Sequence, residues 1–411
     1  MGSFASMSSK PAVGFVLACV FLDAFGIGLI IPVLPRLIGV LAGSADAQTL
    51  WYGAIMVSYG LMQFLAAPMV GAISDHIGRR PVLLAGIFGL SIMMLTPAIS
   101  SSLWLILASR LLGGVMSSNI VVAQAYIADV TPAGKRTAAF GRIGAIFGIA
   151  FILGPALGGL LGERDPRLPF LAASLICAIN FLYGLFVLPE SLATRKTRPI
   201  RLRQLNPFAA ISALGREKLA LPVLLVMTLY TLSQSLMQCT WALYTQFRYD
   251  WNPADIGLSI FALGLSITVV QGLVLPFAAK RLKPRKLVLW GLSLGTASYV
   301  GMALSTNGLI AAVFICTVSL MGMIGPTLQS VVSTTGSPAT QGIRLGAMSA
   351  VNSFTGAISP VIGTPLLLLT SKFSPTSLAA GMPYWLCAVI ASLGIALTLH
   401  FPLPQDPCAR D

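Results

Sequence analysis

One carboxylate, that of Asp23, lies in the middle of a long apolar run. Every other residue from Val13 to Pro35 is apolar, glycine or proline. The run is long enough to cross a bilayer, which takes about 20 residues, and a carboxylate at the centre of such a helix costs about 3 kcal/mol. Because packing does not offset this cost, we predict a functional group that faces a polar cavity. The alternative is a structural carboxylate bound to a neighbouring helix.

Arg110 is a basic residue well inside another apolar run, that of residues 103–128. At ~1.5 Å per residue it lies about 10 Å deep from the outer end, and Asp23 lies roughly 16 Å from the inner end of its own run. In a hydrocarbon core of about 30 Å the two are at nearly the same height. We predict that they interact, directly or through water, until a proton or a substrate separates them. The alternative is an arginine that extends outward to the membrane surface.

A second group of charges, Asp75, Arg79 and Arg80, lies in a short segment between two apolar runs. We predict that Asp75 lies at the start of the following helix, where the helix dipole favours negative charge. The arginines would bind a carboxylate on a neighbouring helix end, with Asp129 as the expected partner. Such a lock would close one side of the protein in one state and break in another. The alternative is that the arginines only set the orientation in the membrane.

Single polar side chains occur on several other apolar runs. Polar groups in hydrocarbon face the helix bundle, so each is a candidate substrate contact and equally a candidate hydrogen bond between helices. These residues are Tyr59, Gln63, Asn119, Gln124, Gln234, Gln238, Trp241, Gln329 and Asn352.

The elements that must position these groups are membrane-spanning helices. Of the 411 residues 56% are hydrophobic and only 9% are charged, against about 25% charged in a soluble domain. Within lipid, helices are the only plausible state for apolar runs of spanning length. Twelve such runs cover residues 13–36, 52–72, 81–100, 103–128, 140–162, 169–188, 220–245, 256–279, 286–304, 308–330, 345–371 and 380–401.

The formal net charge of +14 is distributed unevenly across the predicted membrane. When twelve helices are threaded with both ends on one side, that side receives most of the basic residues. The other side holds only Arg36, Arg164, Arg167, Arg248 and Lys372. This asymmetry predicts that both termini are cytoplasmic. No loop is long enough for a folded basic module, so we expect no nucleic-acid partner, and the six cysteines have no spacing typical of a metal site.

The longest hydrophilic stretch within the chain, Pro189–Lys218, separates six runs from six runs. A basic cluster follows the second run in GAISDHIGRRPVLLAG and the eighth run in LPFAAKRLKPRKLVLWG, which indicates a weak internal duplication. We therefore predict an N-terminal half of residues 1–188, a basic cytoplasmic connector of residues 189–219 and a C-terminal half of residues 220–411. Two related six-helix halves are typical of a secondary transporter with substrate at the midplane.

Two motifs resemble those of a known family. The segment Gly71–Pro81 (GAISDHIGRRP) closely resembles the signature loop of the major facilitator superfamily, and GPALGG at residues 154–159 fits a motif that marks its exporters. The resemblance implies an all-α membrane protein of twelve helices in two pseudo-symmetric halves, with the first motif as a cytoplasmic gate. The motif residues are Gly71, Asp75, Gly78, Arg79, Arg80, Gly154, Pro155, Gly158 and Gly159.

Within this superfamily the chain looks most like the drug/proton antiporters, and among them the tetracycline resistance efflux proteins. The stretches LDAFGIGLIIPVLP, AYIADVTPAGKR, LPES and LNPFAA carry the likeness, which covers the whole chain and is thinner after about residue 220. Those antiporters also embed acids in the third and ninth helices and a histidine in the eighth. Met93, Ile267 and Gly295 lie nearest to these places here. The resemblance therefore favours a drug exporter more than tetracycline itself.

We expect a proton-coupled antiporter of the bacterial inner membrane that exports an amphipathic drug, with tetracycline as the leading candidate. Asp23 and Arg110 would couple protons to transport, and the partners would be the bilayer, protons and one small molecule bound by a monomer. We expect no cofactor and no metal site, and a substrate that carries a chelated metal ion is left open. The alternatives are an exporter of another antibiotic or metabolite, or a nutrient uniporter or importer of the same fold. The nucleophile-elbow pattern GLSLG lies in a predicted spanning helix, so no enzyme is expected.

Overall fold

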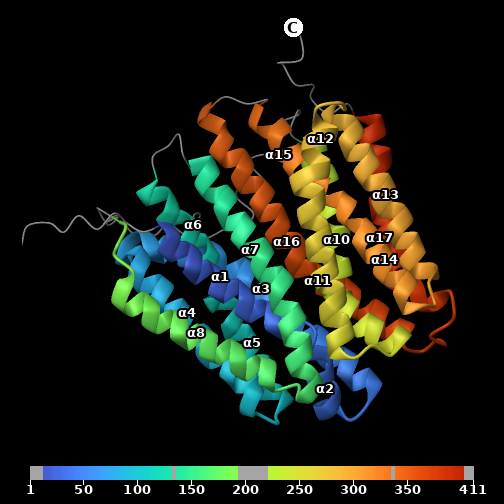
Figure 1. Cartoon of the computed structure of the whole chain (residues 1–411), viewed down its shortest axis with the longest axis horizontal. Helices are drawn as coiled ribbons and strands as arrows, with labels where there is room; N and C mark the ends of the chain where they lie inside the picture. The colour runs from blue at the N-terminus through green and yellow to red at the C-terminus, as the bar shows by residue number, and fades with distance from the viewer. Residues whose placement is uncertain (1–12, 132–135, 193–220, 335–337, 402–411) are drawn as a thin grey trace, which may run out of the picture.

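The computed structural model describes residues 13–131, 136–192, 221–334 and 338–401, and helices dominate these ranges (Figure 1). Most of the predicted connector, residues 193–219, lies outside the described residues, as do both ends of the chain. The helices form two groups, drawn on the left and the right of Figure 1.

The first group, on the left of Figure 1, is formed by the helices before the connector. They are α1 (Val13–Ile30), α2 (Leu34–Ala42), α3 (Ala45–Ile77), α4 (Arg79–Ile99), α5 (Leu103–Met116), α6 (Asn119–Val130), α7 (Arg136–Arg164) and α8 (Leu168–Val187). The predicted single run of residues 13–36 is broken, because α1 and α2 meet at an angle of 43°. Pro32 lies at the break, where it lacks a backbone donor and disfavours helical dihedrals at the residue before it.

The second group, on the right of Figure 1, follows the connector. Its elements are α10 (Leu221–Tyr249), α11 (Pro253–Val269), the π-helical turn η3 (Val270–Val274), α12 (Leu275–Ala279), α13 (Pro284–Leu304), α14 (Gly308–Val318), the 3₁₀ turn η4 (Ser319–Met323), α15 (Ile324–Thr334), α16 (Pro338–Thr370), the 3₁₀ turn η5 (Ala379–Gly381) and α17 (Met382–His400). The path α11–η3–α12 continues one apolar run through a widened π-helical turn. The path α14–η4–α15 continues another apolar run through a tightened 3₁₀ turn.

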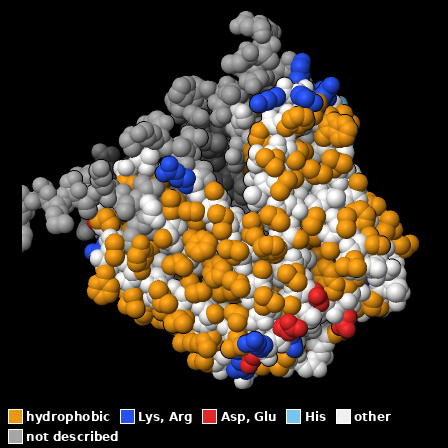
Figure 2. Space-filling view, viewed as in Figure 1, with side chains coloured by type: hydrophobic (Ala, Val, Ile, Leu, Met, Phe, Trp, Pro, Cys, Tyr) orange, Lys and Arg blue, Asp and Glu red, His pale blue; other side chains and the backbone are white. Residues whose placement is uncertain are grey.

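Ten helices within the described residues are long and apolar enough to cross a membrane, and the bent pair α1 and α2 would make an eleventh span. The predicted run of residues 140–162 lies within α7. Figure 2 shows the corresponding surface, on which hydrophobic side chains cover the middle of the molecule and charged side chains gather at its upper and lower ends. The chain is therefore a multi-pass membrane protein.

The GPALGG motif lies where α7 crosses a helix of each group. A Cβ atom at Gly154 would lie 2.9 Å from the Cα atom of Gly28 in α1, and one at Gly158 would collide with the Leu29 carbonyl. One at Gly159 would collide with the Pro253 carbonyl at the start of α11. The close helix approach expected of this motif is therefore present, and it brings the backbones of both groups into contact through α7.

Contacts between the two groups close the molecule at the lower end of Figure 1. Tyr52 Oη in α3 donates to the Cys239 carbonyl of α10 at 3.0 Å, and Gln48 Nε2 donates to Gln246 Oε1 at 3.4 Å. The two groups are thus joined at this end.

Candidate functional site

A central cavity of about 450 Å³ lies between the two groups of helices. Residues of α1, α3, α5 and α6 line one wall, and residues of α10 and α16 line the other. Most of the lining is apolar, as expected of a site for an amphipathic molecule. Four of the predicted substrate contacts line this cavity: Tyr59, Gln63, Gln238 and Asn352.

Arg110 also lines the central cavity, and it is almost without hydrogen bonds. The residue is 4% exposed, and its Nε atom is buried with no partner. Its Nη2 atom lies 3.6 Å from Met94 Sδ, which is a weak acceptor, and its guanidinium lies 5.5 Å from the centre of the Phe170 ring. Among the described residues it is the one charged side chain on the cavity wall.

Asp23 lies in a separate, smaller pocket of about 60 Å³ inside the first group. Its Oδ1 atom accepts a hydrogen bond of 3.0 Å from Asn180 Nδ2 of α8, and the same amide nitrogen lies 3.1 Å from the Cys19 carbonyl. Asn180 was not among the predicted site residues. Its signal was available, because it is a single amide in the middle of the apolar run of residues 169–188.

Among the described residues Asp23 and Arg110 do not pair directly in this conformation, and their predicted interaction through water stays a prediction. Within the described residues no ion pair joins them, and they line different hollows. The residue spacing along each run predicted similar depths in the membrane for Asp23 and Arg110. It did not predict the direction in which each helix presents its side chain. The two hollows nevertheless share Ile27, Gln63 and Ile120 in their walls, so the pocket around Asp23 adjoins the central cavity.

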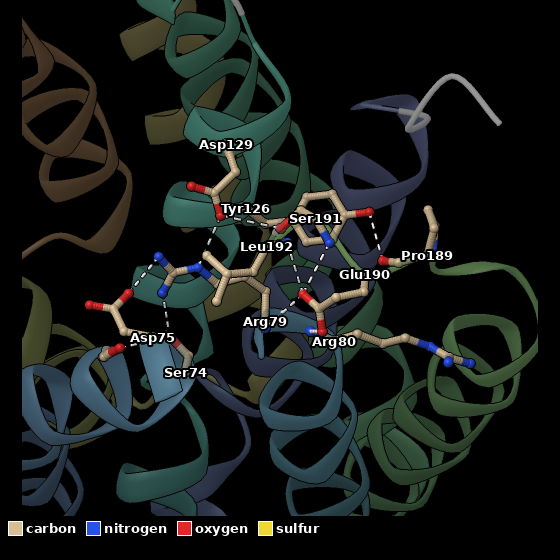
Figure 3. A network of polar contacts seen from close by, with 11 residues as sticks. Ser74, Asp75, Arg79, Arg80, Tyr126, Asp129, Pro189, Glu190, Ser191 and Leu192 are labelled. Carbon is tan, nitrogen blue, oxygen red and sulfur yellow. Dashed lines mark hydrogen bonds and ion pairs between the residues drawn. The ribbon is translucent and has the colours of Figure 1, made fainter. Parts of the chain in front are cut away.

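The charged segment between α3 and α4 forms a compact network centred on Arg79 (Figure 3). Arg79 Nη2 binds Asp75 Oδ1 at 2.6 Å, its Nε binds Asp129 Oδ2 at 3.1 Å, and its Nη1 donates to Ser74 Oγ at 2.5 Å. Arg79 is only 7% exposed, so the two carboxylates and the hydroxyl satisfy a buried cation. The expected bond between Arg79 and Asp129 is therefore present.

Glu190, which sequence reasoning missed, completes this network. Its carboxylate accepts from the backbone nitrogens of Arg79 at 2.9 Å and Arg80 at 3.2 Å, and so caps the first turn of α4 (Figure 3). Gly78 precedes this turn with a φ angle of +120°, and a Cβ atom there would collide with the Glu190 carboxylate. Glycine at this place thus serves both the backbone turn and the close approach of Glu190.

Two details of the predicted lock are corrected. Asp75 lies in the last turn of α3 rather than at the start of α4, so Arg79 offsets its charge where the helix dipole does not. Within the part of the chain that the structure describes, Arg80 binds no carboxylate through its side chain. It donates from Nη2 to the Leu185 carbonyl at 2.7 Å, and its Nε atom is buried without a partner. The bonds drawn in Figure 3 all join parts of the first group and the segment just after α8.

The remaining predicted contacts lie away from the central cavity. Asn119 donates to a backbone carbonyl of α4 at 3.1 Å, Trp241 donates to a serine hydroxyl of α11 at 2.9 Å, and Gln234 accepts from a tyrosine hydroxyl of α13 at 3.0 Å. These three side chains join helices. Gln124 on α6 and Gln329 on α15 are exposed and do not line the cavity.

Comparisons with known proteins agree on one protein family. The Major Facilitator Superfamily model matches residues 16–360. The chain is 34% identical to the class C tetracycline resistance protein of Escherichia coli over 88% of this chain and 90% of that protein. It is 33% identical to the class D tetracycline resistance protein of Salmonella ordonez over 96% of this chain and 98% of that protein. The nucleoside transporter NupG shares the fold, with a TM-score of 0.75 and 13% identity over 94% of this chain and 99% of that one. The chain belongs to the major facilitator superfamily.

Proposed function

We propose that the protein is a proton-coupled antiporter that exports an amphipathic drug, with tetracycline as the leading candidate. Its family and its tetracycline resistance relatives make it a transporter of the drug-efflux type rather than an enzyme. The observation that carries the proton coupling is the position of Asp23. Its carboxylate lies inside the first group with one amide partner, in a pocket that adjoins the central cavity.

The membrane arrangement is part of the proposal. The ten spans and the bent pair, together with α7, would give twelve crossings in an N-terminal half of residues 1–188 and a C-terminal half of residues 220–411. The upper end in Figure 2 would be cytoplasmic, with both termini on that side and residues 189–219 as the connector. We place the protein in the bacterial inner membrane as a monomer.

In this arrangement the central cavity would accept its substrate from the cytoplasmic side. The contacts of Tyr52 and of Gly159 join the two groups at the opposite end, and they would have to break for release. The membrane potential supplies about 2.3 kcal/mol per charge per 100 mV, and the pH gradient ~1.4 kcal/mol per unit. Asp23 would use this energy by exchanging its proton in step with drug binding, so that the proton and the drug move in opposite directions.

We propose that the network around Arg79 belongs to the cytoplasmic gate as an intact unit of the first group, rather than as a lock whose bonds break between states. In the structure its ion pairs with Asp75 and Asp129 lie within the first group, together with the cap from Glu190. These bonds hold the ends of α3, α4 and α6 as one unit. We propose that this unit moves as a rigid body when the halves rock, and that Gly71 and Gly78 belong to it.

A resistance panel tests the proposed function. An efflux-deficient bacterium would express the wild type, Asp23→Asn, or Asp46→Asn as a matched control, and would be challenged with tetracyclines, phenicols, quinolones and dyes. Asp46 is an exposed carboxylate in the first turn of α3, so its variant removes the same charge outside the pocket. We expect resistance in the wild type and the control, and its loss in Asp23→Asn. Drug export is refuted if the wild type protects against no compound, and proton coupling through Asp23 is refuted if Asp23→Asn protects equally.

A further inference from the structure

We infer that the central cavity binds the negative group of an amphipathic organic anion at Arg110. This inference names a substrate class for the proposed exporter and so rests on that function. The juxtaposition that carries it is a buried guanidinium, bonded only to a weak sulfur acceptor and with an unpartnered Nε atom, next to a buried phenol hydroxyl on the wall of one apolar cavity. An anionic oxygen would supply the strong acceptor that the guanidinium lacks.

The first observation is the state of Arg110. A guanidinium offers five N–H donors and is always charged. Here its Nε atom is buried and unpartnered, and its Nη2 atom donates to the sulfur of Met94, which is a weak acceptor. An unpaired buried donor is costly, and more so when charged. The cost is relieved when a ligand in the cavity accepts from it.

The second observation is Tyr59, which lines the same cavity on α3. Its hydroxyl is buried without a hydrogen bond of standard geometry, and its polar neighbour, the Ser117 hydroxyl, donates instead to the Gly114 carbonyl at 3.0 Å. Tyr59 also lies close enough to Arg110 for the two side chains to interact electrostatically. A carboxylate or enolate in the cavity could accept from the guanidinium beside this phenol, as planar oxyanions do from arginine.

The third observation is the charge of the rest of the wall. Within the described residues no carboxylate lines the central cavity, and the opposite wall offers the neutral amides Gln238 and Asn352. Asp23 lies in the adjoining pocket, where it binds Asn180. A cation, or a drug that carries a chelated divalent metal, would bring positive charge beside Arg110, and the described wall of the central cavity has no carboxylate to offset it. The cavity thus favours an anion without bound metal.

Three probes with one ring system separate charge from size. They are anthracene carboxylate, hydroxymethylanthracene and aminomethylanthracene, which are anionic, neutral and cationic at neutral pH. Binding to the purified full-length protein in detergent would be measured by equilibrium dialysis without a gradient. We expect the carboxylate to bind about tenfold or more tightly than the alcohol, because a charged hydrogen bond in a buried site is stronger than a neutral one. The amine should bind most weakly.

The variants assign this preference to Arg110. Arg110→Gln should abolish the difference between carboxylate and alcohol while the alcohol still binds, and Arg110→Lys should restore most of it because the charge returns. Arg281→Gln is the matched control, since it removes the same charge from an exposed residue that stacks on Phe277. It should leave all three affinities unchanged. Retained binding of the alcohol shows that each variant is folded. If Arg110→Gln does not fold, the comparison of the wild type with Arg110→Lys tests the inference instead.

The inference is overturned if the wild type binds the alcohol or the amine as tightly as the carboxylate, if it binds no carboxylate, or if Arg110→Gln keeps the preference. None of these results depends on proton coupling, because no gradient is present. Loss of the carboxylate preference with Asp23-dependent resistance intact would refute only the substrate class. The preference without any resistance would refute only the proposed export.

Discussion

Two arginines of this protein are buried to nearly the same extent and have very different surroundings. Arg248 at the end of α10 is 6% exposed and donates to the carbonyls of Ala303, Ser305 and Ser377 at 3.1, 2.7 and 3.2 Å. Arg110 in α5 is 4% exposed, and its side chain donates to the sulfur of Met94 at 3.6 Å. The first cation is enclosed by protein acceptors, whereas the second lies on a cavity wall.

The contrast separates a structural cation from one held ready for a ligand. The bonds of Arg248 join α10 to the turns after α13 and before α17, so this residue stabilises the second group. Arg110 joins nothing through a strong bond, and the protein bears the cost of a buried, underbonded charge. Departures from full hydrogen bonding are expected where function requires them. The first group therefore carries the ionised groups of the proposed mechanism, and the second group supplies a neutral wall.

The largest expected effect is on stability. Arg248→Met leaves three carbonyls without their donor and should lower the free energy of unfolding by about 3 kcal/mol. Arg110→Met replaces an underbonded cation with an apolar chain and should change stability by under about 1 kcal/mol. Thermal unfolding of both variants in detergent checks this. A greater loss for Arg110→Met would remove the distinction between the two residues.

Transport should show the opposite order. Arg110→Met should lower drug export about tenfold or more, which corresponds to ~1.4 kcal/mol of lost interaction. The fraction of Arg248→Met that folds should transport at nearly the wild-type rate per molecule. Uptake of drug into inverted membrane vesicles, normalised to folded protein, measures both. Equal activity of wild type and Arg110→Met would show that the unbonded guanidinium has no part in transport.

We expect a smaller effect on stability at the cap of α4. A variant of Glu190 tests whether a charged side chain of this region stabilises the fold, as Arg248 does in the second group. Glu190→Ala removes the acceptor for the backbone of Arg79 and Arg80 and should cost about 1 kcal/mol of stability. Glu163→Ala is the control, because Glu163 is an exposed acid near the end of α7. The difference between the two melting temperatures in detergent is the measurement. If they coincide, the hydrogen bonds of Glu190 contribute nothing to the fold.

The smallest effects should separate two glutamines of α10. Gln238 lines the cavity, so Gln238→Ala should raise the KM for the drug a few-fold, consistent with the loss of one neutral hydrogen bond worth about 1 kcal/mol. Gln234 accepts from Tyr299, so Gln234→Ala should lower stability by about 1 kcal/mol and leave KM unchanged. Vesicle transport kinetics and unfolding together check the pair. The reverse assignment would mean that the cavity described here is not the binding site.

Sequence reasoning succeeded where one physical cost determined the answer. The expense of burying Asp23 identified it as exceptional, and charge matching between Arg79 and Asp129 identified a contact that the structure contains. It could not give the orientation of side chains around the helix axis, which decides that Asp23 and Arg110 line different hollows. It also missed Glu190, because an acid in a hydrophilic segment has no unusual cost and its partner Arg79 lies more than a hundred residues away.

The position of Asp23 in a pocket beside the cavity is the centre of the account, and coupled flux tests it most directly. Purified protein in liposomes with an internal pH indicator would receive a drug against which the wild type confers resistance, and proton and drug fluxes would be recorded together. We predict drug-dependent proton movement in the wild type and in Asp46→Asn, and none in Asp23→Asn even where drug still equilibrates. Coupled proton movement of wild-type size in Asp23→Asn would contradict the account.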